Sequence, residues 1–303
     1  MVAITGSSSD SLSGVESVQV SVDGGPPTPA TGTTSWSFTA NSLADGSHTL
    51  TVNVMDRAGN IGSTSVAVTV DTTPPQLTLS SDVTAEATGP SGALVIYTVT
   101  AADSIDGSVT PSCTPASGFA FPLGTTTVNC SATDSAGNTA SGSFHVTVQD
   151  TTPPALTLPA NITTEAIGPG GATVSFSVSA SDLVDGVILP SCSPTSGSMF
   201  ASGTTVVNCS AIDAHGSVGS GSFQVTVRDT TAPVVLVPSP ITQTATNSSG
   251  AIVNFSVSAT DIVDSFVQAT CAPSSGSLFP VGSTIVNCSA TDAQATREQR
   301  RLR

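Results

Sequence analysis

Aspartates recur along this 303-residue chain at a fixed interval, and they are the side chains best suited to chemistry. The stretch Asp71-Thr72-Thr73-Pro74-Pro75 returns at Asp150 and again at Asp229, 79 residues later each time. An acidic loop and a hairpin turn carry further aspartates in the same register. Carboxylates gathered at one place supply the hard oxygen ligands that calcium prefers in proteins.

We expect the linker, acidic loop and hairpin of each copy to meet at one pole of a module, where their carboxylates converge. Glutamates near the far end of two modules, Glu86 and Glu165, are expected to reach the joint that follows. Calcium bound there would relieve charge repulsion and stiffen the joint between modules. The candidate ligands of these interdomain calcium sites are Asp71, Asp103, Asp106, Asp134, Glu86, Asp150, Asp182, Asp185, Asp213, Glu165, Asp229, Asp261, Asp264 and Asp292.

The same aspartates have a purely structural interpretation, because aspartate caps its own backbone in turns. The Asp-x-x-Asp-Gly loop lacks the alternating ligands of an EF-hand. The third copy departs from the pattern, with Thr244 in place of the glutamate and Ser265 in place of glycine. The sequence therefore leaves calcium binding and plain turn chemistry both open.

The six cysteines fall into three pairs, each 17 residues apart and one pair in each copy. An even count in register predicts one disulfide per copy and an oxidising compartment. Zinc is the rival interpretation, but two cysteines without a nearby histidine or second pair do not complete a four-coordinate site. The predicted disulfide residues are Cys113, Cys130, Cys192, Cys209, Cys271 and Cys288.

No constellation typical of an enzyme is present. The three histidines, His48, His145 and His215, do not recur between copies, and none has a nucleophile or second histidine at a useful spacing. A phosphate-binding glycine loop and a nucleophile elbow are also absent. We therefore expect surface histidines and no catalytic activity.

The elements that must position these residues are short strands. In the first copy Val95, Tyr97, Val99 and Ala101 alternate after a glycine turn, and Asp134 opens a hairpin turn. About seven alternating strands in under 80 residues predict an immunoglobulin-like β-sandwich. The expected fold is all-β, with tandem immunoglobulin-like sandwiches in an elongated array. We name its modules the first segment (residues 1–70), repeat 1 (71–149), repeat 2 (150–228) and repeat 3 (229–303).

The stretch from Gly118 through Phe121-Pro122-Leu123-Gly124 to Asn129-Cys130-Ser131-Ala132-Thr133-Asp134 and Gly137-Asn138 resembles the hyalin repeat. This resemblance covers residues 71–292, while the Asp56–Asn60 turn of the first segment is similar to bacterial immunoglobulin-like modules. Hyalin repeats are extracellular modules of surface and adhesion proteins, so the resemblance implies a secreted or surface-anchored array without catalysis.

Both ends of the chain look atypical. The first segment reaches Val2 and Ile4 at once before a serine-rich loop, so we expect its opening strand to be missing. Repeat 3 continues after Asp292 into an arginine-rich stretch that ends at Arg303. We expect this basic tail to replace the last strand, leaving repeat 3 truncated and the least stable module.

The net negative charge of the chain limits the kinds of molecule that it could bind. The net charge is -15 and the sequence contains no lysine, so nucleic acid and anionic membranes would be repelled. No secretory signal and no run long enough to cross a membrane occurs. The expected function is a structural or adhesive segment, extracellular or at the cell surface, with protein or carbohydrate partners. The alternatives are a direct carbohydrate- or protein-binding module and an accessory region of a larger secreted hydrolase.

Overall fold

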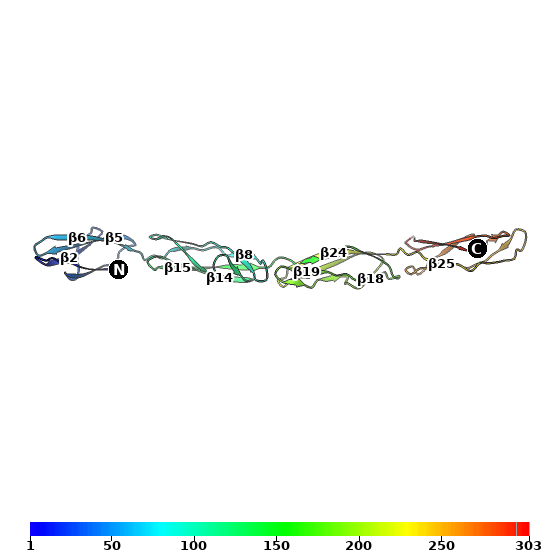
Figure 1. Cartoon of the computed structure of the whole chain (residues 1–303), viewed down its shortest axis with the longest axis horizontal. Coiled ribbons are helices and arrows are strands. Elements are labelled where there is room, and N and C mark those ends of the chain that lie inside the picture. Colours follow the sequence, from blue (N-terminus) through cyan, green and yellow to red (C-terminus); the bar gives the residue numbers. More distant parts are fainter. Residues whose placement is uncertain (295, 303) are drawn as a thin grey trace. The chain divides into compact units, whose positions relative to one another are not determined.

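Strands are the only regular elements in the computed structural model, which describes residues 1–294 and 296–302 (Figure 1). The all-β prediction is confirmed. The chain divides into two compact units, one spanning Met1–Gln149 and the other beginning at Asp150. No helix among the described residues is long and apolar enough to cross a membrane.

The first segment forms a four-stranded sheet, ordered β3-β2-β5-β6, and a two-stranded sheet, β1-β4. Valines of β2 and β5, together with Leu50, build its core, against which Trp36 packs. Val2–Ser7 form a strand, β1, antiparallel to β4. The strands are β1 (Val2–Ser7), β2 (Val15–Val22), β3 (Thr28–Pro29), β4 (Ser35–Ala40), β5 (Gly46–Asp56) and β6 (Ile61–Val70).

Repeats 1 and 2 share one topology. In each, the last strand lies in a four-stranded sheet between a long antiparallel neighbour and a short parallel strand, in the orders β12-β14-β15-β8 and β17-β24-β23-β21. The remaining strands form a three-stranded and a two-stranded sheet in each repeat.

The strands of repeat 1 are β7 (Gln76–Thr78), β8 (Val83–Glu86), β9 (Ala93–Val95), β10 (Thr100–Asp103), β11 (Gly107–Val109), β12 (Ser112–Thr114), β13 (Phe119–Phe121), β14 (Gly124–Thr133) and β15 (Thr139–Gln149). Those of repeat 2 are β16 (Ala155–Thr157), β17 (Ile162–Glu165), β18 (Ala172–Val174), β19 (Ser179–Asp182), β20 (Gly186–Ile188), β21 (Ser191–Ser193), β22 (Ser198–Phe200), β23 (Gly203–Ile212) and β24 (Val218–Arg228).

The long strand that we expected over residues 95–101 is interrupted. Val95, Tyr97 and Ala101 are buried as predicted, but β9 ends at Val95 and β10 begins at Thr100. Between them a serine hydroxyl replaces the ladder: Ser117 Oγ accepts from the Tyr97 N–H at 2.9 Å and donates to the Tyr97 carbonyl at 2.8 Å. The chain thus moves from pairing with β13 to pairing with β7 and β11.

Repeat 3 has a reduced version of this fold, with sheets β28-β30-β31, β25-β27 and β26-β29. The basic tail takes the place of the last strand in sequence, and it forms a strand of its own, β31, against β30. Ladder bonds involve only the backbone, so the arginine side chains stay exposed while Leu302 is buried. The strands are β25 (Val234–Leu236), β26 (Ala251–Ile252), β27 (Ser258–Thr260), β28 (Ala269–Ala272), β29 (Leu278–Phe279), β30 (Val286–Thr291) and β31 (Arg297–Leu302).

The predicted disulfides are present as Cys113–Cys130, Cys192–Cys209 and Cys271–Cys288, and no described cysteine is free. In each repeat the two cysteines stand opposite each other on neighbouring antiparallel strands. One cysteine of each pair is buried in the core.

Replacing both Cys192 and Cys209 by alanine is expected to destabilise repeat 2 by about 3 kcal/mol, because the unfolded chain regains the entropy of an open loop. Scanning calorimetry should then show one transition moved down by about 12 °C or more. The same pair of substitutions at Cys113 and Cys130 serves as a matched control on repeat 1. An unchanged calorimetric profile in both variants would contradict this account.

Candidate functional site: the carboxylate poles

The acidic loop of each repeat is folded by its first aspartate. Asp103 closes β10, and its Oδ1 accepts from the N–H groups of Ile105 (2.7 Å) and Asp106 (3.1 Å). Asp182 and Asp261 make the same pair of bonds in repeats 2 and 3. This is the turn chemistry that the sequence favoured, and it occupies one oxygen of each aspartate.

The second aspartate of the loop ties it to the hairpin. Asp106 Oδ2 accepts from the Ser135 N–H at 2.6 Å, which lowers the pKa of Asp106. Asp185 and Asp264 reach the backbone N–H groups of Ala214 and Ala293 in the same way. The acidic loop and the hairpin, about 30 residues apart, therefore hold each other in place.

The hairpin aspartate caps its own turn. Asp213 Oδ1 accepts from the backbone N–H groups of His215 and Ser217, and Asp292 Oδ1 accepts from that of Thr296. The linker aspartate caps likewise, since Asp229 Oδ1 accepts from the Thr231 N–H at 3.1 Å. The second carboxylate oxygen of each of these aspartates, Oδ2, takes no part in this capping.

The carboxylates of linker, acidic loop and hairpin converge in every repeat. We call each gathering a carboxylate pole. The sets whose ligand atoms all lie within 4.8 Å of one another are Asp71, Asp106 and Asp134 in repeat 1; Asp150, Asp182 and Asp213, and also Asp150, Asp185 and His215, in repeat 2; and Asp229, Asp261 and Asp292 in repeat 3.

Buried oxygens without a hydrogen-bond partner distinguish these poles from ordinary capped turns. Among the described residues, Oδ2 accepts no hydrogen bond in Asp71, Asp150, Asp213, Asp229, Asp261 and Asp292, although Asp150 Oδ2 lies 3.3 Å from His215 Nδ1. The residues Asp150, Asp213, Asp229 and Asp292 are each less than a tenth exposed. An unpaired buried anionic oxygen is costly, and such atoms are rare in native proteins without an ion or water to explain them.

The surroundings of two linker aspartates, Asp71 and Asp229, oppose ionisation of their carboxyl groups. Burial raises the pKa of Asp229, and the nearby carboxylates of Asp261, Asp292 and Glu165 raise it further. The pKa of Asp71 is raised for the same reasons, with burial the larger cause and Asp103, Asp134 and Asp45 contributing. A bound cation would remove both causes, because it supplies opposite charge where solvent does not reach.

In repeat 1 the hairpin aspartate has a partner for the oxygen that stays unpartnered in repeats 2 and 3. There Asn138 donates its side-chain amide to Asp134 Oδ2 at 2.9 Å. The matching positions hold Ser217 and Thr296, and the hairpin aspartates beside them, Asp213 and Asp292, keep an unpartnered Oδ2.

Thr296→Asn should therefore stabilise repeat 3 in the absence of divalent cations by about 1 kcal/mol, through a new amide bond to Asp292 Oδ2. Calorimetry in EDTA should show its transition rise by roughly 4–8 °C. Asn138→Thr in repeat 1 is the reciprocal control and should lower that repeat's transition. If neither substitution moves a transition, the Asn138 amide does not compensate the buried oxygen.

His215 is not the isolated surface histidine that we expected. Its Nδ1 lies 3.3 Å from Asp150 Oδ2 and 3.3 Å from Asp185 Oδ2, so repeat 2 places an imidazole beside its carboxylates. Sequence reasoning set it aside because repeat 1 has Ala136 and repeat 3 has Gln294 at that position. The only feature of the sequence that pointed to His215 as a neighbour of the carboxylates was its place within the hairpin turn.

Near the far ends of two modules, a carboxylate accepts hydrogen bonds from the linker that follows the module. Both carboxylate oxygens of Glu165 accept from the threonines after Asp229: Oε1 from the Thr230 N–H (2.6 Å) and the Thr231 hydroxyl, and Oε2 from the Thr230 hydroxyl. Asp45, which sequence reasoning missed, likewise accepts from the Thr72 N–H at 3.0 Å and from the Thr72 and Thr73 hydroxyls. Asp45 lies in the first segment, which does not share the 79-residue repeat from which Glu165 was recognised as a candidate. Glu86 closes β8 opposite Gln149.

Family models match each of the four modules of the chain. Residues 70–148, 149–227 and 228–300 each match the HYR domain family, and residues 4–72 match the bacterial Ig-like domain family. Hyalin of Lytechinus variegatus is 34% identical over 261 residues, which cover 80% of this chain and 49% of that protein. Hyalin of Strongylocentrotus purpuratus is 36% identical over 272 residues, which cover 84% of this chain and 22% of that protein.

The chain thus spans about half the length of the first of these relatives, and less of the second. A solved structure of protocadherin gamma B7 extracellular cadherin domains 1-4 aligns with 94% of this chain and 91% of its own, at 12% identity and a TM-score of 0.34.

Proposed function

This chain belongs to the HYR domain family, and from that premise we propose that it is a non-catalytic segment of an extracellular adhesive array whose repeats bind calcium at their carboxylate poles. The partners of such an array are other extracellular proteins. Three disulfides support an oxidising location outside the cell.

The observation that carries the calcium proposal is the set of buried Oδ2 atoms without partners. Turn capping accounts for the other oxygen of Asp229, Asp261 and Asp292, but it gives no reason to bury the second. Calcium takes six to eight oxygen ligands and accepts carboxylates, backbone carbonyls and waters together. Three convergent carboxylates supply half of such a shell, leaving the rest to carbonyls and water.

Repeat 3 offers the strongest case. All three of its converging aspartates have an unpartnered Oδ2, and no described arginine or histidine forms an ion pair with any of them. Glu165 adds negative charge and holds the linker from which Asp229 projects. An ion at this pole would therefore couple the linker, the acidic loop and the hairpin of repeat 3 into one rigid unit.

Calcium titration of the whole chain tests this function. Calorimetric binding should give dissociation constants near 10⁻⁴ to 10⁻³ M, the range of extracellular modules. At a hundredfold excess over the dissociation constant the bound repeat gains about 2.7 kcal/mol, which corresponds to a melting temperature about 10 °C higher. Magnesium, which demands a tighter octahedral shell, is the control and should stabilise less. Unchanged melting in 10 mM calcium would refute the proposal.

A further inference from the structure

The carboxylate pole of repeat 2 differs from the other two because a histidine lies in it. His215 Nδ1 is 3.3 Å from Asp150 Oδ2 and 3.3 Å from Asp185 Oδ2, and the three ligand atoms of this set all lie within 4.8 Å of one another. The matching positions in repeats 1 and 3 hold Ala136 and Gln294, neither of which has an imidazole. The pole of repeat 2 therefore combines a nitrogen donor with its carboxylates.

Two carboxylate oxygens face one imidazole nitrogen in this triad, and Nδ1 carries at most one hydrogen. Nδ1 forms a hydrogen bond with Asp185 Oδ2, whereas Asp150 Oδ2 is buried without one. The Asp150 side chain is 0% exposed, and a buried anionic oxygen without a partner is costly. A single hydrogen serves one of the two oxygens, while a metal ion between the three atoms would contact all of them.

Backbone N–H groups hold the side chains of the triad in this orientation. Asp185 Oδ2 accepts from a backbone N–H of the hairpin at 3.1 Å, and Asp150 Oδ1 accepts from the Thr152 N–H at 3.2 Å. The N–H of His215 itself donates to Asp213 Oδ1 at 2.9 Å. Outer contacts of this kind orient the ligands of metal sites. The His215 side chain is 35% exposed, which leaves an ion a path from solvent.

The donor types of the triad favour zinc over calcium. Calcium takes six to eight oxygen ligands, whereas zinc binds imidazole nitrogen together with carboxylate oxygen in a four-coordinate shell. With bonds of about 2.0–2.2 Å, neighbouring atoms of a tetrahedral shell stand about 3.3–3.6 Å apart. Both separations at His215 Nδ1, 3.3 Å each, match that spacing. Three protein ligands leave the fourth place of a zinc ion to water.

Among the described residues, the other two histidines each face a single carboxylate. His48 Nδ1 lies 2.7 Å from Asp23 Oδ2, and its Nε2 is bonded to the Ala44 carbonyl at 2.8 Å, so both ring nitrogens are occupied. His145 Nδ1 lies 3.5 Å from Asp82 Oδ1, and both of these side chains are more than half exposed. Neither place gathers three ligands for a zinc ion.

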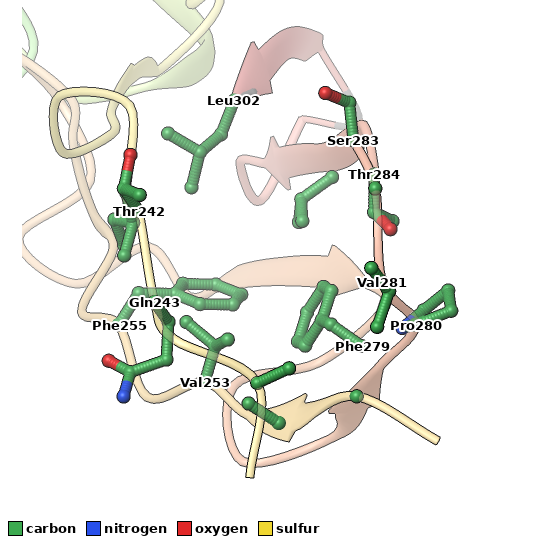
Figure 2. A pocket seen from close by; sticks show the side chains of 16 residues that line it. Thr242, Gln243, Val253, Phe255, Phe279, Pro280, Val281, Ser283, Thr284 and Leu302 are labelled. Carbon is green, nitrogen blue, oxygen red and sulfur yellow. The ribbon is translucent and has the colours of Figure 1, made fainter. Parts of the chain in front are cut away.

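A pocket of about 370 Å³ in repeat 3 offers no such ligands either. Figure 2 shows Val253, Phe255 and Phe279 along it, with Thr242 and Gln243 nearby. None of the described residues that line it is charged, and none is a histidine. One zinc ion per chain is therefore the expected number.

We propose that the pole of repeat 2 binds zinc through Asp150, Asp185 and His215, in preference to calcium. The carboxylates of Asp182 and Asp213, which form a second set with Asp150, add negative charge that favours a dication. Zinc at this place joins the linker, the acidic loop and the hairpin of repeat 2. The proposal concerns this pole alone and does not depend on calcium binding in repeats 1 and 3.

Calorimetric titration of the whole chain with zinc chloride, in 10 mM calcium, tests the proposal. The unsubstituted chain should bind one zinc ion, and His215→Ala should weaken that binding at least about tenfold because a ligand is lost. His145→Ala removes an imidazole elsewhere, so this matched control should bind zinc as the unsubstituted chain does. Zinc binding that survives His215→Ala, or no zinc binding by the unsubstituted chain, would overturn the proposal.

A reciprocal variant asks whether the imidazole is what selects zinc. Ala136→His places a histidine at the matching position of repeat 1, in the hairpin beside Asp71 and Asp106. This variant should bind two zinc ions per chain, and a count that stays at one would contradict the assignment. A chain that binds zinc but melts unchanged in calcium refutes the calcium function alone, whereas one that responds to calcium and not to zinc refutes this inference alone.

Discussion

In EDTA, Asp261→Asn is expected to melt at a higher temperature than the unsubstituted chain, and in calcium at a lower one. Asp261 Oδ1 accepts from the backbone N–H groups of Val263 and Asp264, and an asparagine oxygen retains both bonds. The new amide replaces a buried oxygen that has no partner and stands among the carboxylates of Asp229 and Asp292. One repulsive charge disappears and a donor takes its place, which should stabilise the cation-free repeat by about 1–3 kcal/mol.

With calcium present the sign reverses, because the same substitution removes a ligand. Loss of the pole's share of binding energy costs up to about 2.7 kcal/mol at a hundredfold excess of calcium. Paired calorimetric scans in EDTA and in 10 mM calcium measure both arms. Asp82→Asn, at an exposed aspartate that belongs to none of the carboxylate poles, is the control and should respond equally in the two conditions. A variant that is destabilised in both conditions would mean that Asp261 has a purely structural role.

Gly171→Ala is expected to destabilise repeat 2 by more than about 3 kcal/mol. Gly171 has a φ of +99°, and a Cβ added there would lie 1.8 Å from the carbonyl oxygen of Phe200. That carbonyl belongs to β22, whose ladder with β18 and whose buried phenylalanine prevent it from moving aside. Backbone strain and a steric clash therefore add together.

Gly197→Ala separates the two causes. Gly197 also has a positive φ, +83°, but its Cβ would meet nothing within 4 Å. This substitution carries the strain alone and should cost about 1–2 kcal/mol. Calorimetry should therefore move the repeat 2 transition about twice as far for Gly171→Ala as for Gly197→Ala. Equal shifts would mean that the Phe200 carbonyl yields and that only φ matters.

Periodicity and spacing were sufficient to predict much of this molecule. The alternation of Val95, Tyr97 and Ala101 identified one inward face, and each pair of cysteines 17 residues apart formed the disulfide expected of it. Both depend on contacts between residues near in sequence. The break between β9 and β10 was missed because the hydroxyl that replaces the ladder, on Ser117, comes from a loop 20 residues away.

The sequence did not indicate that the basic tail forms a strand, because composition says little about backbone pairing. Arg297–Leu302 have few β-branched side chains, yet a hairpin places them beside β30, where the ladder needs only backbone groups. Low intrinsic strand propensity did not prevent strand formation, because the edge of β30 lies beside the tail and pairs with its backbone.

The sequence by itself determined the 79-residue register, the sandwich fold, the disulfides and the pole to which the aspartates belong, since capping and alternation are local properties of the chain. Only the tertiary structure decided which carboxylate oxygens are buried without a hydrogen-bond partner. One oxygen of Asp229, Asp261 and Asp292 is bound within its own turn, and packing of three separate loops buries the other. The same through-space packing brought His215 against Asp150. These features arise where distant segments meet, so no local pattern encodes them.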